Sequence, residues 1–418
     1  MLFFKECRKI LFSLTFILYF AAMLAMYFTQ FHGDCNETIY EPQPGQTDYG
    51  MIEKEVPEIL MPAAAESLVR EYLSGSFSAY PIGFYKEVKL NQKKKLQMSE
   101  IINEITGITE EQLDSFGEYE ESGITMNQNG EMVYIESEIP EINIPESLTY
   151  EHFRELMRET DKIIGGGSMY SDDRIVGEFS TVPETYEDAL AEYNQFLSED
   201  KITGAYARLF CDYMGITAAI LPVFAAVSLA ALDKKSRMEQ LAYSRKISSI
   251  KLIFVRYAAL VFTMVIPVFI TATVALFRVK SMYPDNAADY SAIYRYSAIW
   301  LIPNIMTASA VGMLITEIAS GLLAIFVQAV WWFCSITGSP DTLTGNIGKL
   351  TLVIRHNSIF GLDLFKADYG NFIFNRIFYA VVSVAAIAVT AFIYEQKRRG
   401  SFNGIAIRIK NPELKSKA

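Results

Sequence analysis

The sequence predicts an α-helical integral membrane protein with six transmembrane helices and an α+β, mainly helical, extracellular domain inserted between helices 1 and 2. Two observations predict this class: the apolar residues gather in long runs, and charge is divided unevenly along the chain. A helix needs about twenty apolar residues to cross a hydrocarbon layer of roughly 30 Å. Irregular backbone cannot satisfy its own polar groups in lipid, so these runs are interpreted as helical spans.

The apolar runs set the predicted spans. They are Ile10–Phe28, Leu209–Leu232, Leu252–Phe277, about Ala298–Thr316, Gly321–Ser335 and Ile377–Tyr394. A secretory signal peptide is the alternative for the first run, but its apolar region normally has about seven to fifteen residues before a small-residue cleavage site. Residues 10–28 exceed that length and Thr29–His32 offers no such site, so a retained anchor is expected.

Charge predicts the orientation of the chain. Residues 30–205 hold 36 acidic and 12 basic residues, a net charge of −24, whereas the remainder carries +13. The bases lie beside the proposed spans, and the positive-inside rule places such flanks in the cytoplasm. The predicted organisation is a cytoplasmic N-terminus with span 1 (1–29), an acidic extracellular domain (30–205), a five-helix membrane domain (206–394) and a cytoplasmic tail (395–418).

Within 30–205, helices are predicted near Pro57–Leu73 and Gln92–Ile105, and a strand over Glu131–Glu136. Thr109–Gln112 and Thr181–Glu184 fit the capping box, in which a hydroxyl and a carboxyl or amide group satisfy the free N–H groups of a helix start.

The link from this domain to the second span, Asp200–Arg208, contains no proline and only Gly204. Two interpretations are possible: the helix continues into the membrane, or it breaks at Gly204.

Enzymatic chemistry finds no support in the sequence. None of the three histidines belongs to a His-Glu-x-x-His pattern, no Gly-x-Ser-x-Gly elbow occurs, and no phosphate-binding loop is present, so we expect no catalytic residue and no metal ligand. No cofactor bound by this chain and no nucleic-acid partner is expected either. Cys35 and Cys211 both map near the outer face, either as a disulfide or as two free thiols.

Polar residues inside spans are candidates for function, because an ion at the bilayer centre costs about 2.5–3.5 kcal/mol even on insertion scales. Asp212 and Asn304 are the candidates for a substrate path. The alternative for Asp212 is an ordinary interfacial carboxylate, since it falls near the outer end of its span.

A basic stretch, 233–251, separates the second and third spans. Met238, Leu241 and Ala242 recur at helical spacing and form a narrow apolar stripe, which suits docking into the groove of a partner. A solvated basic loop, or a helix resting on anionic lipid, is the alternative.

The stretch Leu229–Tyr257 resembles the segment between the second and third spans of ABC-2 type transporter permeases of Gram-positive bacteria. An acidic residue and basic residues end the second span. A Glu-x-Leu-like helix and a Ser-Arg-x-Ile-Ser turn follow, and Lys251 then enters the third span. Ser236 and Lys246 depart from the Gly and Pro often found there. The resemblance implies a coupling helix that docks on an ATPase subunit. Its docking residues would be Asp233, Lys234, Arg237, Met238, Glu239, Leu241, Ala242 and Arg245.

The resemblance also implies the partners and the location. They are a separate ABC ATPase that holds ATP and Mg, a second permease subunit, identical or not, and the lipid of a bacterial plasma membrane, with both termini cytoplasmic. The expected function is movement of a substrate, most simply export. A membrane-anchored sensor or receptor, or an antimicrobial-peptide resistance module whose extracellular domain binds a ligand, is the alternative.

Overall fold

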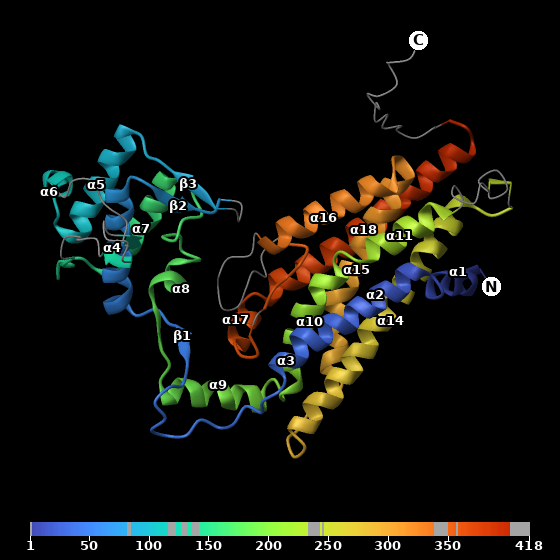
Figure 1. Cartoon of the computed structure of the whole chain (residues 1–418), viewed down its shortest axis with the longest axis horizontal. Coiled ribbons are helices and arrows are strands. Elements are labelled where there is room, and N and C mark those ends of the chain that lie inside the picture. The colour runs from blue at the N-terminus through green and yellow to red at the C-terminus, as the bar shows by residue number, and fades with distance from the viewer. Residues whose placement is uncertain are drawn as a thin grey trace, which may run out of the picture. The chain divides into compact units, whose positions relative to one another are not determined.

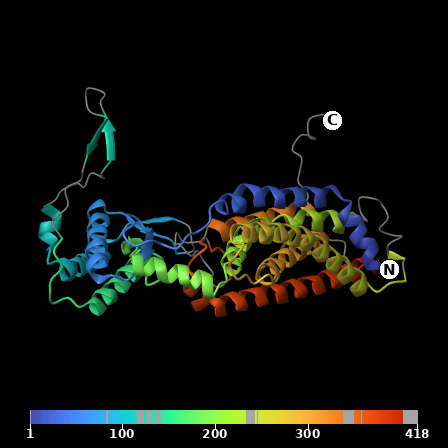
Figure 2. The same ribbon diagram turned by 90° about the horizontal axis from the view of Figure 1, so that it is seen from below.

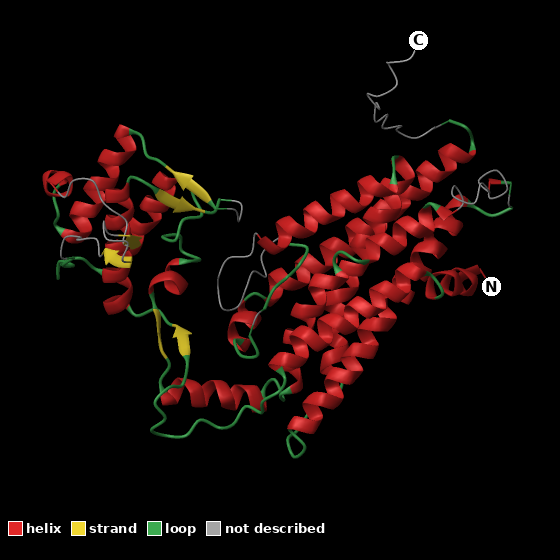
Figure 3. Ribbon diagram, in the orientation of Figure 1, coloured by secondary structure: helices red, strands yellow, loops and turns green. Residues whose placement is uncertain are grey.

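The computed structural model describes residues 2–81, 85–115, 123–126, 132–135, 142–232, 243–244, 246–337, 350–356 and 358–401, with backbone only for 123–126 and 132–135. Helices dominate and strands are few (Figure 3). The described residues divide into two compact units. The inserted unit comes from residues 42–189, and the membrane unit comes from residues up to 41 and from 190 onward. The sequence-based boundaries of the inserted domain were 30 and 205.

Five helices of the membrane unit are long and apolar enough to cross a membrane, and they are Leu14–Asp34, Thr203–Ala230, Ser249–Met282, Ala292–Ile318 and Tyr369–Arg398. The remaining predicted span, Gly321–Ser335, corresponds to α16 (Gly321–Thr337), an apolar helix of 17 residues. At about 1.5 Å per residue it falls short of a 30 Å layer. Over its described residues the chain is thus an α-helical membrane protein with five candidate spans, and the predicted sixth is not confirmed.

The first predicted span starts later and ends later than residues 10–28. Ser13 separates α1 (Leu2–Leu11) from α2 (Leu14–Met26), because its hydroxyl caps α2 by accepting from the Phe16 N–H and donates to the Ile10 carbonyl. A π-helical turn, η1 (Tyr27–Phe31), and the short α3 (His32–Asp34) extend α2.

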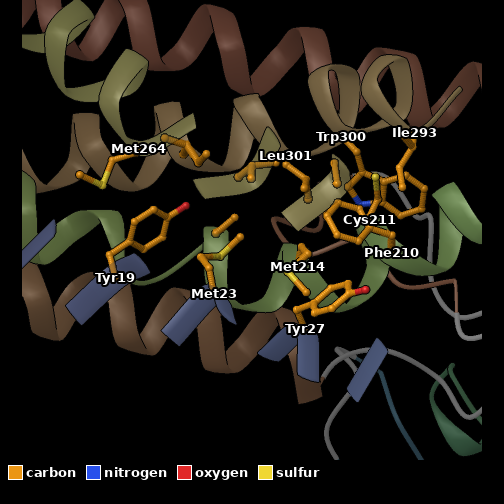
Figure 4. Packing of buried hydrophobic residues seen from close by; sticks show 14 of the residues in the cluster. Tyr19, Met23, Tyr27, Phe210, Cys211, Met214, Met264, Ile293, Trp300 and Leu301 are labelled. Atoms are coloured by element: carbon orange, nitrogen blue, oxygen red, sulfur yellow. The ribbon is translucent and has the colours of Figure 1, made fainter. Parts of the chain in front are cut away.

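α15 (Ala292–Ile318) is the central helix of the membrane unit, packing against α10 (Thr203–Ala218), α11 (Pro222–Ala230), α14 (Ser249–Met282), α16 and α18 (Tyr369–Arg398). Figures 1 and 2 show α2 and α18 on opposite sides of this bundle. Tyr19 and Met23 of α2 and Tyr27 of η1 point into the core toward α10, α14 and α15 (Figure 4). Gly312 permits a close approach of α15 to α11, since a Cβ there would lie 2.6 Å from Ala226 Cβ on α11.

The second span is broken between α10 and α11. Pro222 has no N–H to donate and the backbone turns at residues 219–221, which leaves carbonyls without helical partners. Side chains of α16 supply the donors: Gln328 Nε2 lies 2.6 Å from the Ala219 carbonyl, and Trp332 Nε1 lies 2.8 Å from the Ile216 carbonyl. Two carbonyls of the break are therefore satisfied by donors within the protein, as a lipid environment favours.

The bundle has two chemically different ends. At the basic end α11 stops, α14 begins and α18 stops, with Lys397 paired to Glu317 at 3.0 Å and Ser249 bonded to Glu395 at 2.5 Å. At the other end, the network end, α10 and α18 begin and α14 stops.

The inserted unit is a small α+β fold with mainly helical content. Its helices are α4 (Pro57–Ser74), α5 (Gln92–Thr106), α6 (Glu110–Ser115), α7 (Tyr150–Ile164) and α8 (Ile175–Phe179), and its strands are β1 (Met51–Glu53), β2 (Phe77–Ala79), β3 (Lys86–Val88), β4 (Gly123–Met126), β5 (Met132–Ile135) and β6 (Thr181–Pro183). The strands form three antiparallel pairs, β1 with β6, β2 with β3 and β4 with β5. Leu60, Leu68, Ile102 and Phe153 belong to the buried core between α4, α5 and α7.

The two predicted capping boxes have different outcomes. The box at Thr109 is confirmed, because the Thr109 N–H donates to Gln112 Oε1 at 2.9 Å and the Gln112 N–H to Thr109 Oγ1 at 3.4 Å. The box at Thr181 is wrong: Thr181 lies in β6, and α9 (Tyr186–Ser198) is capped by Thr185, whose hydroxyl accepts from the Asp188 N–H. Pairing of β6 with β1 takes precedence over the local capping signal.

The chain breaks between α9 and α10, so the interpretation as one continuous helix is wrong. Lys201 and Ile202 both have positive φ, and the Thr203 N–H donates to the Lys201 carbonyl at 2.6 Å, which closes a tight γ-turn. Positive φ is strained for a β-branched residue such as Ile202. The break lies just before Gly204. Cys35 and Cys211 are buried free thiols, so the disulfide is not formed.

We predict a pH-dependent contact between α5 and α7. His152 Nε2 lies 2.6 Å from Glu104 Oε1, and hydrogen bonds to Glu104 and then Glu155 raise the pKa of His152. A raised pKa means that the stabilisation is fully present below the unfolded value of about 6.5 and is lost as pH rises through the folded value. Amide hydrogen exchange in α5 and α7 should be faster in His152→Gln than in the wild type at about pH 5.5 and equal at about pH 8.5. An equal difference at both pH values would contradict this role.

Candidate functional site

Buried polar side chains gather at the network end of the membrane unit. They come from the α9–α10 turn, α10, α15, α18 and the irregular segment 350–356, and they are Asp200, Arg208, Asp212, Asn304, Arg355, His356 and Arg376. Arg355 is partly exposed, whereas the other six side chains are buried. We call these seven residues the buried network.

The Asp200–Arg208 ion pair is built by the break before α10. Arg208 donates from both terminal nitrogens to the two Asp200 oxygens, at 2.6 and 2.7 Å. The γ-turn brings the Asp200 carboxylate back against α10, and Gly204 is required there because a Cβ would lie 2.9 Å from Asp200 Oδ1. A bidentate geometry of this kind gives an arginine–carboxylate pair both strength and a fixed orientation.

Arg208 also holds the segment that comes after α16 in the chain. Its Nε donates to His356 Nε2 at 3.2 Å, and its Nη2 donates to the Ile359 carbonyl at 3.2 Å. His356 is therefore a neutral acceptor. Burial, and then the charge of Arg208, lower the pKa of His356 to about 3, so this histidine stays uncharged across the physiological range.

Asp212 provides the second attachment of the same segment to α10. Its Oδ1 accepts from Arg355 Nε at 2.8 Å and from the His356 N–H at 2.7 Å. Asp212 and Arg355 are 143 residues apart in the chain. Together with Arg208, Asp212 fixes residues 355–356 along one side of α10.

Arg376 secures the irregular backbone from the α18 side. It donates to Asn304 Oδ1 at 2.6 Å and to the Leu352 carbonyl at 3.1 Å, and Tyr379 donates to the Leu350 carbonyl at 2.5 Å. Leu352, a non-helical residue, is fully buried, so its carbonyl requires a protein donor. Within the described residues, every hydrogen-bond acceptor of Arg376 is neutral, unlike those of Arg208.

α17 (Leu362–Ala367) inserts one aromatic ring beside the network. Phe365 is 2% exposed and stacks on Trp300 with ring centroids 6.1 Å apart and an interplanar angle of 4°. The Arg208 guanidinium lies 5.5 Å from the centre of the same ring. α17 is also tied to α9, because Gln195 donates to Asp363 at 2.7 Å and Lys366 pairs with Glu199.

Four buried polar atoms of this region have no hydrogen-bond partner in the described structure: Asp212 Oδ2, Trp300 Nε1, Asn304 Nδ2 and His356 Nδ1. Unpaired buried groups of this kind are rare in folded proteins and call for an explanation. The four side chains are fully buried, and Cys211, Phe210 and Trp300 lie close together in Figure 4.

The structure brings the two predicted path residues, Asp212 and Asn304, into this one network. Sequence reasoning missed the other five members, Asp200, Arg208, Arg355, His356 and Arg376. Arg208 and Arg376 directly precede predicted spans, where they resembled ordinary interfacial charges. A signal existed for Arg376, since it directly precedes the apolar run at Ile377 and has no acid within one helical turn in the sequence. The role of Asp212 and Asn304 in a substrate path stays a prediction.

The predicted docking residues, Asp233, Lys234, Arg237, Met238, Glu239, Leu241, Ala242 and Arg245, lie outside the described residues. The structure does describe the chain beside them, at Tyr243 and Ile247. Arg398, at the end of α18, donates to the Tyr243 carbonyl and to the Ile247 carbonyl, both at 2.8 Å, and the Tyr243 ring packs edge-on to Tyr394 at 5.4 Å.

The chemistry of the site is that of charge pairing. Among the residues that the structure describes, no group of three His, Cys, Asp or Glu side chains could hold a metal ion. The network can orient charges and hold an irregular segment in a low-dielectric environment. The chain matches no family model, no curated protein and no solved structure.

Removing one partner of the buried pair should be far more damaging than removing an exposed neighbour. Asp200→Asn leaves Arg208 charged and buried, and should lower the free energy of unfolding by about 3–5 kcal/mol. Glu199→Gln, the adjacent residue with a half-exposed carboxylate, should change it by at most about 1 kcal/mol. Denaturant unfolding of the chain in detergent, followed by tryptophan fluorescence, measures both. Equal effects would show that Asp200 and Arg208 do not form a buried pair.

Proposed function

We propose that this chain is the permease subunit of an ABC-2 type ABC transporter, exporting a substrate with ATP hydrolysed by a separate ATPase subunit. In this proposal the protein lies in a bacterial plasma membrane, with the basic end in the cytoplasm and both termini inside. Five span-length helices and the resemblance of Leu229–Tyr257 to the coupling segment of such permeases support it, and the proposal takes the shorter apolar helix α16 as the sixth crossing that both termini inside require. Partnership with a second permease subunit, identical or not, is part of the proposal.

The observation that carries the proposal is the attachment of Arg398 to the chain just after the predicted coupling segment. The two 2.8 Å hydrogen bonds to Tyr243 and Ile247 connect that chain to the last span, while Ser249 begins the third span directly after it. A displacement of the coupling segment would therefore reach α14 through the chain and α18 through Arg398. A basic loop that only interacts with water or lipid needs no such attachment.

The proposed mechanism moves the bundle between two arrangements. The ATPases close on ATP, the coupling segment moves with them, and α11, α14 and α18 move at the basic end. The break at residues 219–221, held by Gln328 and Trp332, separates α11 from α10, so the two halves of the second span need not move as one rod. ATP drives the change only insofar as the two arrangements differ in their affinity for the closed ATPases.

A charge on the apolar stripe of the coupling segment should release the ATPase. Leu241→Asp places a carboxylate where the proposal needs an apolar contact, so the ATPase should no longer copurify with the permease. Gln240→Asp adds the same charge one position away, off the stripe, and should leave the complex intact. Retention of the ATPase and its activity by Leu241→Asp would contradict docking, and absence of any ATPase from the wild-type preparation would favour a receptor.

Loss of the Arg398 attachment should uncouple the subunits without separating them. Arg398→Met keeps an apolar stem but removes both hydrogen bonds to Tyr243 and Ile247. The ATPase should still copurify, and ATP turnover of the complex in liposomes should fall several-fold. The control is Arg399→Met, because Arg399 bonds only to Glu395 on its own helix among the contacts described and is largely exposed. Equal turnover in both variants would show that the attachment transmits nothing.

A further inference from the structure

We propose that a patch of lysines on the inserted unit binds the anionic headgroups of a lipid bilayer. The patch lies on and just after β3, in the first turn of α5 and near the end of α7 (Figure 1). Its members are Lys86, Lys89, Lys93, Lys94, Lys95 and Lys162. We call these six residues the lysine patch. This surface is additional to the proposed transport function, and it does not depend on that function.

The lysine patch is an exception within a strongly acidic unit. Residues 42–189 hold 30 acidic and 11 basic residues, and six of those 11 bases belong to the patch. The stretch 85–97 contains five lysines and a single acidic residue, Glu87. Positive charge is therefore concentrated at one place on a unit that otherwise carries a large negative charge.

The bases outside the patch are paired with carboxylates, whereas most of those inside it are not. The other five bases of the unit each form an ion pair, and they are Lys54, Arg70, Arg154, Arg158 and Arg174. Within the patch, Lys89 alone has a carboxylate partner among the described residues, Glu87 at 3.3 Å. The exposed lysines with no carboxylate partner in the described structure are Lys86, Lys93, Lys95 and Lys162. These four cations are available to an anion from outside the chain.

Three of the lysines stand where a helix disfavours them. Residues 93–95 are all lysine and lie in the first turn of α5, which contains no acidic residue. The start of a helix carries a partial positive charge, so acidic side chains are stabilising there and basic ones are not. Lys94 Nζ donates to the Ile163 carbonyl at 2.6 Å, which joins the start of α5 to the end of α7 beside Lys162. Local rules of this kind are broken mainly where a surface has a function.

The residues beside the lysines fit a lipid surface better than a soluble polyanion. Tyr85 is 61% exposed and Leu96 is 47% exposed, and both adjoin patch lysines in the chain. Such side chains enter the boundary between headgroups and acyl chains, while the ammonium groups of neighbouring lysines stay at the phosphates. A soluble polyanion offers no apolar layer for them. Lysine also acts as a mobile point charge without fixed bidentate geometry, which suits a fluid array of headgroups.

A bilayer is also the anionic surface to which the chain keeps this unit tethered. The inserted unit continues into the membrane unit at both of its ends, at residues 42 and 189. Tethering makes a second contact effectively intramolecular, so a weak electrostatic patch is enough for binding.

Cosedimentation with vesicles tests the lysine patch. The full-length chain, held in nanodiscs of phosphatidylcholine, should sediment with sucrose-loaded vesicles that contain phosphatidylglycerol and should not sediment with vesicles of phosphatidylcholine alone. Binding should weaken as sodium chloride is added, because salt screens exposed charges. Failure to sediment with the phosphatidylglycerol vesicles at low salt would overturn the proposal.

Matched charge variants assign the binding to the patch rather than to the basic end of the membrane unit. Lys86→Gln/Lys93→Gln removes two lysines without carboxylate partners and should weaken vesicle binding by about fivefold for each lysine. Lys54→Gln/Arg70→Gln removes the same charge from two ion-paired, partly exposed bases, so its binding should equal that of the wild type. Equal binding by the two double variants would refute the assignment.

A change at Tyr85 separates a lipid surface from a soluble polyanion. Tyr85→Ser should weaken binding to phosphatidylglycerol vesicles and leave binding of inorganic polyphosphate unchanged, because the ring contacts apolar material only in the bilayer. Polyphosphate binding that is lost in Lys86→Gln/Lys93→Gln, together with vesicle binding that is unaffected by Tyr85→Ser, would assign the patch to a soluble polyanion and overturn the lipid assignment.

Discussion

The membrane unit depends on one constraint: in lipid, a backbone or side-chain polar group must find its partner inside the protein. Two departures from regular helix show how this chain meets it. At the break between α10 and α11, Gln328 of α16 donates to the Ala219 carbonyl. In the segment 350–356, donors of α18 hold the carbonyls, with Arg376 bonded to Leu352 and Tyr379 to Leu350. Polar residues in apolar helices are thus placed where the backbone is irregular.

The same constraint explains why charges cluster at the network end. Each ion that leaves water needs a partner with good geometry, since an isolated buried charge is destabilising by several kcal/mol. Arg208 meets this requirement with the two Asp200 oxygens and Arg355 with Asp212. Arg376 meets it with neutral carbonyl and amide oxygens and has no carboxylate partner among the described residues. Its positive charge beside Asn304 is therefore not neutralised by an ion pair. The same arginine side chains therefore hold the segment 350–356 in place and set the balance of charge in the buried network.

Sequence reasoning worked where the signal was local. Apolar runs located the five candidate spans, and the helices predicted near Pro57–Leu73 and Gln92–Ile105 match α4 and α5 within one residue at each end. It failed where partners are distant. The Thr181 capping signal was overridden by pairing of β6 with β1, and no pattern near Asp212 reveals Arg355, which is 143 residues away. The α9–α10 break was also hidden, because nothing in the identity of Ile202 indicates a positive φ. The Asp200–Arg208 ion pair, which spans this turn, stabilises that conformation.

The turn between α9 and α10 therefore connects α9 to two other elements of the membrane unit. Glu199 and Asp200 are neighbours in sequence, yet Glu199 pairs with Lys366 on α17 and Asp200 pairs with Arg208 on α10. The end of α9 is fixed to two elements at once, and Phe365 of α17 rests against the same Arg208 that Asp200 holds. The link to α10 is a buried ion pair, in which loss of one partner costs about 3–5 kcal/mol, whereas the exposed pair to α17 contributes at most about 1 kcal/mol. What holds α17 in place is therefore mainly its buried ring, because Phe365 packs on Trp300 and Phe372.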